Sequence, residues 1–437
     1  MVSRSAARSP AVRDATSFSS GHPVYESSPI LKRPVLILGW IPRIIVPIAR
    51  SLHSHGIQVD LADCVNAPRI AYRSRAIREF VRVQYPDYSL EEFATGLRDF
   101  IKRQGHDLLI PTDDLGLTAL MECYEDLKDI VEIACPPPSV TRRVLNKAYT
   151  LEAAQRCGIC VPRTVIVSNS EQLNEQIDGF PFPWVLKPVA KERRLKKFKS
   201  CSISSVHDIT RLFPAPREFD PPMLLQEHCA GDGVGVEILL HRGECVAVFQ
   251  HRRLKELPYT GGVSVTAVSE PPDPTLVQQS TTLLRALEWE GPAMVEFKVN
   301  SADGRVTLME VNGRYWGTIS LPITAGIDFP LYDWQLRHGE PVAACKSYSA
   351  GIKWRWTTGR LDRLYRLFAE ARDSDSARKA LRKDLLSLPM DFTPLTRDAT
   401  FRFSDPFPSL IHLARALYYF AQHLPEAIKG ELPEMVF

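Results

Sequence analysis

The chain has 437 residues, of which 44% are hydrophobic and 24% are charged, and its formal net charge is +3. This length predicts two to four compact lobes with room for a buried core. The small net charge does not indicate a nucleic-acid partner or an anionic membrane, and we expect no nucleic acid to bind.

Cysteine usage and the absence of targeting signals indicate a cytoplasmic protein. Nine cysteines form an odd set without the dense spacing of a disulfide framework, as is typical of a reducing compartment. We expect no transmembrane segment, because no apolar run approaches the roughly 20 residues needed to cross a bilayer. Residues 1–30 are rich in Ser and Arg and lack an apolar core, so we predict a disordered tail there.

The next segment alternates between strand and helix patterns. The apolar run PVLILGW precedes IPRIIVPIARSLHSHG, which has helical spacing and a glycine stop at Gly56, and IQVDLADC follows as a second strand. This order predicts an N-terminal α/β domain with a parallel sheet over residues 34–140. The first turn, G-W-I-P-R, is not G-x-G-x-x-G, so a dinucleotide is not indicated there.

A predicted helix over Ser89 to Gln104 has Ser89 as N-cap and Glu92 three residues later, which is the pattern of a capping box. The strand that follows ends in Thr112-Asp113-Asp114. Polar residues just past the carboxyl end of a parallel strand lie where open α/β sheets bind ligands. The aspartates equally suit the cap of the helix that begins at Leu115, and both interpretations stay open.

The segment from Pro292 to Gly317 predicts a β-hairpin, because two alternating apolar runs flank the turn signal Asp303-Gly304. If the turn centres on Asp303, Glu296 and Glu310 lie opposite each other, and Asn312 shares their face. Opposed carboxylates repel unless a cation lies between them, and hard oxygen ligands suit Mg²⁺. The hairpin is therefore either a metal platform or an edge ribbon whose polar side chains face water.

An ordered set of motifs resembles the ATP-grasp superfamily, most closely its carbamoyl-phosphate-synthetase-like and biotin-carboxylase-like carboxylate-amine ligases. Asn312-Gly313-Arg314 follows the second glutamate of the hairpin, while Lys147, Lys187 and Gln226-Glu227 precede it. The resemblance covers residues 34 to 340. It implies a pre-ATP-grasp domain over 34–140 and an ATP-grasp domain of two α+β lobes over 141–340.

The resemblance also implies nucleotide-binding roles. Lys147, within a helix predicted over Thr141 to Cys157, and Lys187, near the end of the strand PWVLKP, would contact the phosphates of ATP. The implied hinge at the adenine edge is Gln226-Glu227-His228-Cys229. Glu237 matches a position where relatives place an acid near the nucleotide or its metal.

Two arginines suit an anionic substrate, because a guanidinium fork pairs with carboxylate and phosphate oxygens. Arg253 ends a predicted strand beside the glycine loop Gly261-Gly262, although an arginine-rich edge strand is an alternative. Arg314 stands two residues beyond Asn312. The segment KERRLKKFK, residues 191–199, replaces the glycine-rich lid of most relatives, and it is either a phosphate-binding loop or a solvated face.

Residues 341–437 match no family motif and predict a mostly helical C-terminal extension. Leu410 to Leu424 reads as an amphipathic helix, which would dock on the catalytic body or contact a membrane surface or partner. There is no biotin-acceptor M-K-M motif, so carboxylation of biotin is not indicated.

The resemblance implies an ADP-forming ligase that uses ATP and Mg²⁺, for which Mn²⁺ can substitute. Such an enzyme activates a carboxylate as an acyl phosphate for attack by an amine, and its substrates would be small molecules such as amino acids. The alternative is a non-catalytic nucleotide-binding or scaffold protein of the same fold. The sequence leaves the identity of both substrates open, and also the oligomeric state, a homo-oligomer included.

Overall fold

A computed structural model describes residues 32–65, 70–83, 85, 89–177, 179–190, 200–344 and 347–429. The predicted tail, residues 1–30, and the basic segment 191–199 lie outside this part of the chain. The helices and strands below all belong to the unit formed by residues 33–437.

The N-terminal sheet is parallel and has the strand order β3-β2-β1-β4-β5, as the β-α-β rhythm of the sequence predicts. Its strands are β1 (Val35–Leu38), β2 (Val59–Asp63), β3 (Phe80–Arg82), β4 (Leu108–Pro111) and β5 (Glu132–Ile133). Its helices are α1 (Pro42–Ser54), the 3₁₀ turn η1 (Ala71–Arg73), α2 (Leu90–Gln104), α3 (Asp114–Glu122) and α4 (Tyr124–Leu127). The capping box at Ser89 and Glu92 is confirmed, and Asp113 caps α3 by accepting from Gly116 N–H.

Two short helices, α5 (Pro138–Leu145) and α6 (Lys147–Arg156), lead to the small sheet. This sheet is antiparallel in the order β6-β9-β7-β8. Its elements are β6 (Thr164–Asn169), α7 (Ser170–Glu175), β7 (Trp184–Pro188), β8 (Cys201–Ile203), α8 (Val206–Leu212) and β9 (Glu218–Glu227). One face of it packs around buried Trp184 and Phe180.

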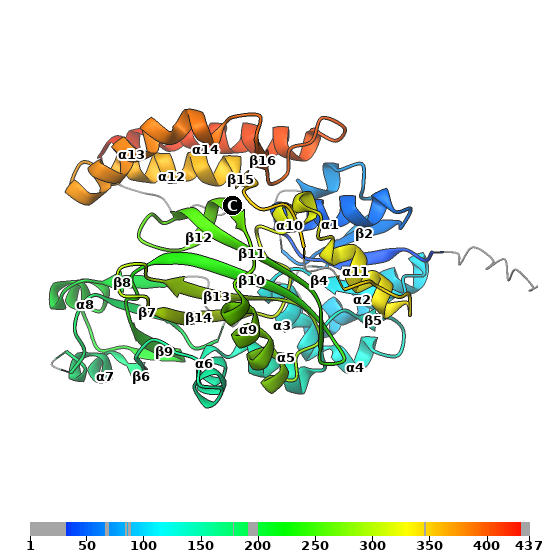
Figure 1. The fold of residues 1–437 in the computed structure, drawn as a ribbon, viewed down its shortest axis with the longest axis horizontal. Coiled ribbons are helices and arrows are strands. Elements are labelled where there is room, and N and C mark those ends of the chain that lie inside the picture. Colours follow the sequence, from blue (N-terminus) through cyan, green and yellow to red (C-terminus); the bar gives the residue numbers. More distant parts are fainter. Residues whose placement is uncertain are drawn as a thin grey trace, which may run out of the picture. The chain divides into compact units, whose positions relative to one another are not determined.

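The large sheet has the order β14-β13-β10-β11-β12-β15-β16, and only its last pair, β15 and β16, is parallel among the pairs described. Its strands are β10 (Asp232–His241), β11 (Glu244–Leu257), β12 (Val263–Glu270), β13 (Gly291–Val299), β14 (Val306–Asn312), β15 (Lys353–Arg355) and β16 (Thr396–Asp398). The associated helices are α9 (Pro274–Ala286), α10 (Ser320–Ala325) and α11 (Phe329–Arg337). In Figure 1 this sheet occupies the centre, with α9 across one of its faces.

The two faces of the large sheet have different cores. Val236 and Ile238 of β10 pack with α9 and α6. Phe249 of β11 and Ala267 of β12 belong instead to the core that contains α1, α10 and α11, so the N-terminal domain and this sheet share one hydrophobic core. That shared core fixes the carboxyl edge of β1 and β4 against the segment that follows β14.

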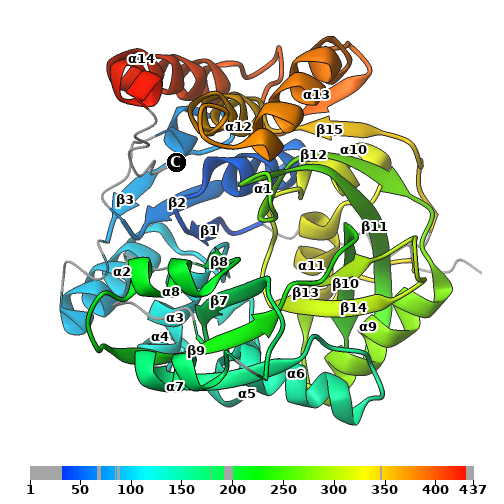
Figure 2. The same ribbon diagram turned by 90° about the vertical axis from the view of Figure 1, so that its left-hand side faces the viewer.

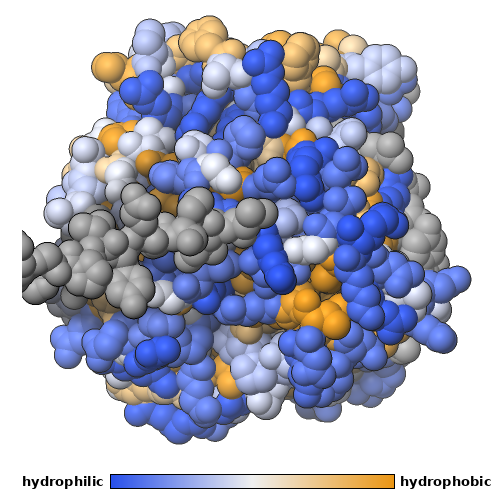
Figure 3. Space-filling view, turned by 90° about the vertical axis from the view of Figure 1, so that its right-hand side faces the viewer, coloured by the Kyte–Doolittle hydropathy of each residue, from blue (hydrophilic) through white to orange (hydrophobic). Residues whose placement is uncertain are grey.

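The C-terminal helices α12 (Thr357–Glu370), α13 (Asp375–Asp391) and α14 (Phe407–Lys429) form a layer over one end of the large sheet (Figures 1 and 2). The helix predicted at Leu410 to Leu424 is present and longer than predicted. α13 and α14 keep apolar side chains in solvent, among them Leu386, 84% exposed, and Tyr418, 66% exposed. Apolar side chains accordingly gather at the top of Figure 3, over these helices.

The predicted fold class, α/β with a parallel first sheet, α+β lobes and a helical C-terminal extension, is confirmed. The single helix predicted over Thr141 to Cys157 is wrong. The chain leaves the helical conformation at Asn146, whose side chain accepts from Tyr149 N–H and starts α6. No helix in the described ranges is long and apolar enough to cross a bilayer.

Candidate active site

The hairpin of β13 and β14 places Glu296 opposite Glu310, as the sequence predicts, but by a different route. Near the turn, Val299 faces Val306 and Phe297 faces Leu308, a register that would put Glu296 opposite Met309. An irregularity between Glu296 and Phe297 shifts the register by one residue. Both carboxylates consequently stand on one face, with side chains 17% and 23% exposed.

Asn312 lies beside Glu296, and its Nδ2 donates to Glu296 Oε1 at 2.9 Å. Its Oδ1 accepts from Arg314 Nη2 at 3.0 Å. Arg314 in turn forms two hydrogen bonds to Asp114, at 2.8 and 3.0 Å. Because Asp114 opens α3, this chain of contacts ties the end of the hairpin to the carboxyl edge of the N-terminal sheet.

Arg253 lies between two carboxylates. Its Nη2 is 2.6 Å from Glu296 Oε2 and its Nη1 is 3.2 Å from Glu256 Oε1. Burial lowers the pKa of Arg253, but the negative charges of Glu296 and Glu256 have the larger combined effect. The pKa of Arg253 is therefore above its usual range. The side chain can lie across β10 because residue 233 is glycine, where an added Cβ would be 2.9 Å from Arg253 Cδ.

Lys147 is the first residue of α6 and lies between the two sheets. Its backbone N–H donates to Val189 O, just past β7 of the small sheet. Its Nζ is 3.5 Å from Pro188 O and 3.9 Å from Glu310 Oε1 of the large sheet. The break of the helix at Asn146 creates this position, because it turns the amino end of α6 toward the hairpin.

Lys187 lies in β7 between two buried residues, Leu186 and Pro188. Leu186 points into the core of the small sheet. Strand alternation therefore directs Lys187 to the opposite face, where it is paired in register with Leu224 of β9.

The predicted hinge lies where the chain passes from the small sheet to the large one, since β9 ends at Glu227 and β10 begins at Asp232. Backbone N–H groups of Glu227 and His228 donate to Arg163 O and Pro183 O. Glu227 Oε1 is 2.5 Å from Arg305 of the hairpin turn. Further contacts of this segment include Gln226 Nε2 to Thr164 Oγ1 at 3.0 Å and Cys229 Sγ to Glu227 O at 3.9 Å.

Glu237 is fully buried, and its Oε1 is 2.5 Å from His251 Nδ1. Burial raises the pKa of Glu237 above its usual range against the opposing effect of His251. Gly235 makes room for the imidazole, because an added Cβ would lie 2.5 Å from His251 Cε1. The register places Glu237 on the same face of the sheet as Glu296, since Gly235 is paired with Glu296, but the Glu237 side chain is buried against His251 of β11.

Glu296, Glu310 and Asn312 offer oxygen ligands of the kind that a divalent cation prefers. Within the part of the chain that the structure describes, no group of three or more His, Cys, Asp or Glu side chains could hold a metal. Arg253 and Asn312 engage both oxygens of Glu296, and Arg314 engages the amide oxygen of Asn312. These oxygens suit a magnesium ion chemically. For it to bind, the nitrogen donors of Arg253, Asn312 and Arg314 would have to release the oxygens that they now contact.

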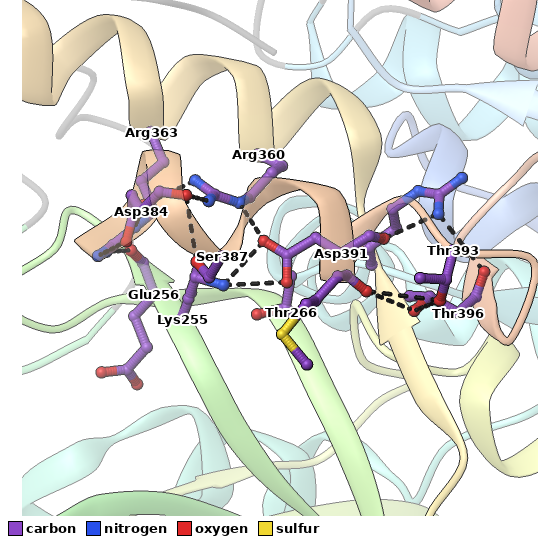
Figure 4. A network of polar contacts seen from close by, with 12 residues as sticks. Lys255, Glu256, Thr266, Arg360, Arg363, Asp384, Ser387, Asp391, Thr393 and Thr396 are labelled. Carbon is purple, nitrogen blue, oxygen red and sulfur yellow. Dashed lines mark hydrogen bonds and ion pairs between the residues drawn. The ribbon is translucent and has the colours of Figure 1, made fainter. Parts of the chain in front are cut away.

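Sequence reasoning missed the polar network that connects this site to the C-terminal helices (Figure 4). Arg360 of α12 pairs with Asp384 at 2.6 Å and with Asp391 at 2.8 Å, both in α13. Arg363 pairs with Asp384 at 2.6 Å and also donates to the backbone oxygen of Glu256. The spacing of Arg360 and Arg363, three residues apart on α12, was visible in the sequence. Their partners Asp384 and Asp391 were not, because they belong to a different helix.

The arrangement of the three sheets is that of the ATP-grasp fold. The structure resembles N5-carboxyaminoimidazole synthetase from Staphylococcus aureus, with a TM-score of 0.56 and 13% identity over 74% of this chain and 82% of that one. It also resembles L-amino acid ligase from Bacillus licheniformis, with a TM-score of 0.53 and 16% identity over 69% and 73% of the two chains.

A third neighbour is the biotin carboxylase domain of Hydrogenobacter thermophilus 2-oxoglutarate carboxylase in complex with MgADP and bicarbonate. Its TM-score is 0.54, with 13% identity over 73% of each chain. Residues 219–360 match the model of a family described as ATP-grasp in the biosynthetic pathway with Ter operon. This segment contains every candidate site residue except Lys147 and Lys187. A search of curated proteins finds no match.

Proposed function

We propose that the chain is an ATP- and Mg²⁺-dependent ligase that joins a small-molecule carboxylate to an amine with release of ADP and phosphate. The observation that carries the proposal is the convergence of Lys147, Glu310 and Glu296 between the two sheets, with Lys147 Nζ 3.9 Å from Glu310 Oε1. The likeness to solved ligases and carboxylases of the same fold supports the reaction type.

The chemical problem is the leaving group. A carboxylate does not acylate an amine at neutral pH, because oxide would have to leave. Attack of a carboxylate oxygen on the γ-phosphorus of ATP expels ADP and gives an acyl phosphate. Attack of the amine nitrogen on the acyl carbon then expels phosphate, and the amine loses a proton to give the amide.

The residues of this chain would manage charge and position in that sequence. Lys147 and Lys187 would hold phosphate oxygens as point charges. Bound at Glu296, Glu310 and Asn312, Mg²⁺ would supply neutralisation of the charge that develops on the transferred phosphoryl group. Arg314 is held by Asp114 beside that set, so it can orient the carboxylate or the acyl phosphate.

Arg253 would have a different role in the same site. Arg253 is paired with both Glu296 and Glu256. If Glu296 binds a metal instead of Arg253, the Nη2 edge of the guanidinium becomes available to an oxyanion. The backbone of residues 226–229, between the two sheets, would contact the adenine. We place this activity in the cytoplasm, on the basis of the cysteine usage.

The Arg253–Glu296 ion pair favours a second candidate, a protein of this fold that binds a nucleotide without turnover. An ADP-release screen with pairs of amino acids and small carboxylates separates the two. A ligase gives ADP release that requires Mg²⁺ and both substrates, and Glu310→Gln abolishes it. If an ATP analogue binds while no pair stimulates ADP release, the non-catalytic function is correct.

A further inference from the structure

Arg43 lies at the meeting point of the N-terminal domain, the segment after the hairpin and the C-terminal extension. It is the second residue of α1, the helix that follows β1. Its guanidinium stacks on the ring of Trp356, with Cζ 3.9 Å from the ring centroid. It also passes Gly317 so closely that a Cβ added there would lie 2.7 Å from Arg43 Nε.

This guanidinium has no acceptor among the residues that the structure describes. Its Nε is buried without a hydrogen-bond partner, although the side chain as a whole is only partly buried. Other arginines in the core or the site are each paired with a carboxylate: Arg50, Arg253, Arg314, Arg337, Arg360 and Arg363. A desolvated cation without a counterion is costly, so the position of Arg43 calls for an anion.

The surroundings of Arg43 are positive and contain buried polar atoms that are not hydrogen-bonded within the described residues. The nearby Arg314 is already balanced by Asp114. Nε1 of Trp356 and Oγ1 of Thr318, the residue after Gly317, are also buried and have no hydrogen-bond partner in the part of the chain that the structure describes. Burial, followed by the charge of Arg314, lowers the pKa of Arg43 to about 10, so it remains a cation at neutral pH. The first turn of α1 carries no acidic residue and no side-chain cap.

We propose that Arg43, stacked on Trp356, binds an anionic group of the small-molecule substrate, a carboxylate or phosphate other than the carboxylate that is activated. The inference rests on the proposed ligase function and narrows its substrates to compounds with a second negative charge. Gly317 is only three residues beyond Arg314, so an anion held at Arg43 lies beside the arginine that orients the reacting group. Trp356 belongs to the extension, which gives that region a part in substrate recognition.

Ligand-induced stabilisation tests the site without any turnover. The probes are two matched pairs at equal ionic strength: succinate against butyrate for a carboxylate, and glycerol 3-phosphate against glycerol for a phosphate. Succinate or glycerol 3-phosphate, the more highly charged member of each pair, should raise Tm by about 1–2 °C at ten times its Kd in at least one pair, and butyrate or glycerol should not. The pair that responds identifies the anion.

Two variants assign this effect to Arg43. Arg43→Gln removes the charge, and Gly317→Ala keeps the charge but places a Cβ against Arg43 Nε. Both should abolish the selective shift, whereas Arg73→Gln, which removes an exposed arginine of the same domain, should retain it. If Arg43→Gln does not unfold cooperatively, Gly317→Ala and the wild-type chain decide the question.

The inference is overturned if neither pair shows a selective shift in the wild-type chain, or if both variants retain the shift. Failure of the ligase proposal would look different, since ADP release would be absent while the Arg43-dependent shift persisted. In the wild-type chain KM should be higher for a singly charged than for a doubly charged substrate. Where turnover is found, Arg43→Gln should lower the ratio of these two KM values toward unity, a change of about tenfold in selectivity.

Discussion

Arg253 Nη2 lies 2.6 Å from Glu296 Oε2, so a guanidinium occupies one edge of the carboxylate predicted to bind a metal. Both side chains are largely buried, 12% and 17% exposed, and Glu256 approaches the same arginine from the other side. Two carboxylates on one small area of the sheet are thus tolerable without a metal, because Arg253 balances them.

Substitution of Arg253 should lower the free energy of unfolding. Arg253→Gln leaves Glu296 and Glu256 close together without their shared cation, so we expect a loss of about 3–5 kcal/mol in unfolding free energy, measured with urea. Arg211→Gln, which removes an exposed arginine 3.7 Å from Asp208, should cost less than about 1 kcal/mol. Adding Glu296→Gln to Arg253→Gln should restore part of the loss, and a purely additive double variant would contradict this account.

Glu310 should matter for turnover far more than for stability. Its ion pair with Lys147 is long, at 3.9 Å, so Glu310→Gln should change the unfolding free energy by less than about 1 kcal/mol. The variant should lower Mg²⁺-dependent ADP release by about 100-fold or more, because a ligand for the metal is lost. Unchanged turnover would refute the metal platform, and the melting temperature serves as the control for folding.

Lys147 should act on nucleotide affinity. Lys147→Met removes a charge that lies between β7 and the hairpin, and we expect the Kd of a non-hydrolysable ATP analogue to rise about 10- to 100-fold. Lys128→Met removes an exposed lysine paired with Glu125 and should leave that Kd within about twofold. Calorimetric titration of both variants distinguishes a phosphate contact from a general effect of charge.

The C-terminal helices should depend on the buried ion network. Asp384→Asn leaves Arg360, which is fully buried, and Arg363 with less negative charge, so we expect a loss of about 3–5 kcal/mol in the free energy of unfolding. Glu152→Gln, at the exposed pair with Arg156, should cost about 0.5 kcal/mol or less. Equal effects of the two substitutions, measured by urea unfolding, would contradict the role of the network.

Asp113 should make the stability pH-dependent. Burial raises its pKa from 3.8 to about 6. Between these values the folded chain holds a proton that the unfolded chain has lost, so stability falls as pH rises through this window, by roughly 3 kcal/mol in total. Asp113→Asn keeps an acceptor for Gly116 N–H and should remove this slope. The difference between the two stability curves from pH 4 to 7 isolates Asp113, and identical curves would exclude it.

Local sequence determined those features that depend on neighbours along the chain. The capping box at Ser89, the alternation of β13 and β14 and the parallel first sheet follow from hydrogen bonding and side-chain period, and each was predictable. The break at Asn146 was not predicted, although its signal was present, because asparagine favours an N-cap over a helix interior. The pairing of Glu296 with Glu310 was predicted from a turn centred on Asp303. In the structure the two residues are paired because the register shifts by one residue between Glu296 and Phe297.

Only the tertiary structure decided how charges pair across elements that are distant in sequence. Arg314 meets Asp114 across 200 residues, and Arg363 of α12 reaches the backbone of Glu256 in β11. A sequence lists cations and carboxylates without their distances, and the energy of an ion pair depends on separation and burial. For the same reason the sequence, where carboxylates are plentiful, does not reveal that Arg43 has no carboxylate partner among the described residues. This becomes evident only when the shared core brings α1, Gly317 and Trp356 together.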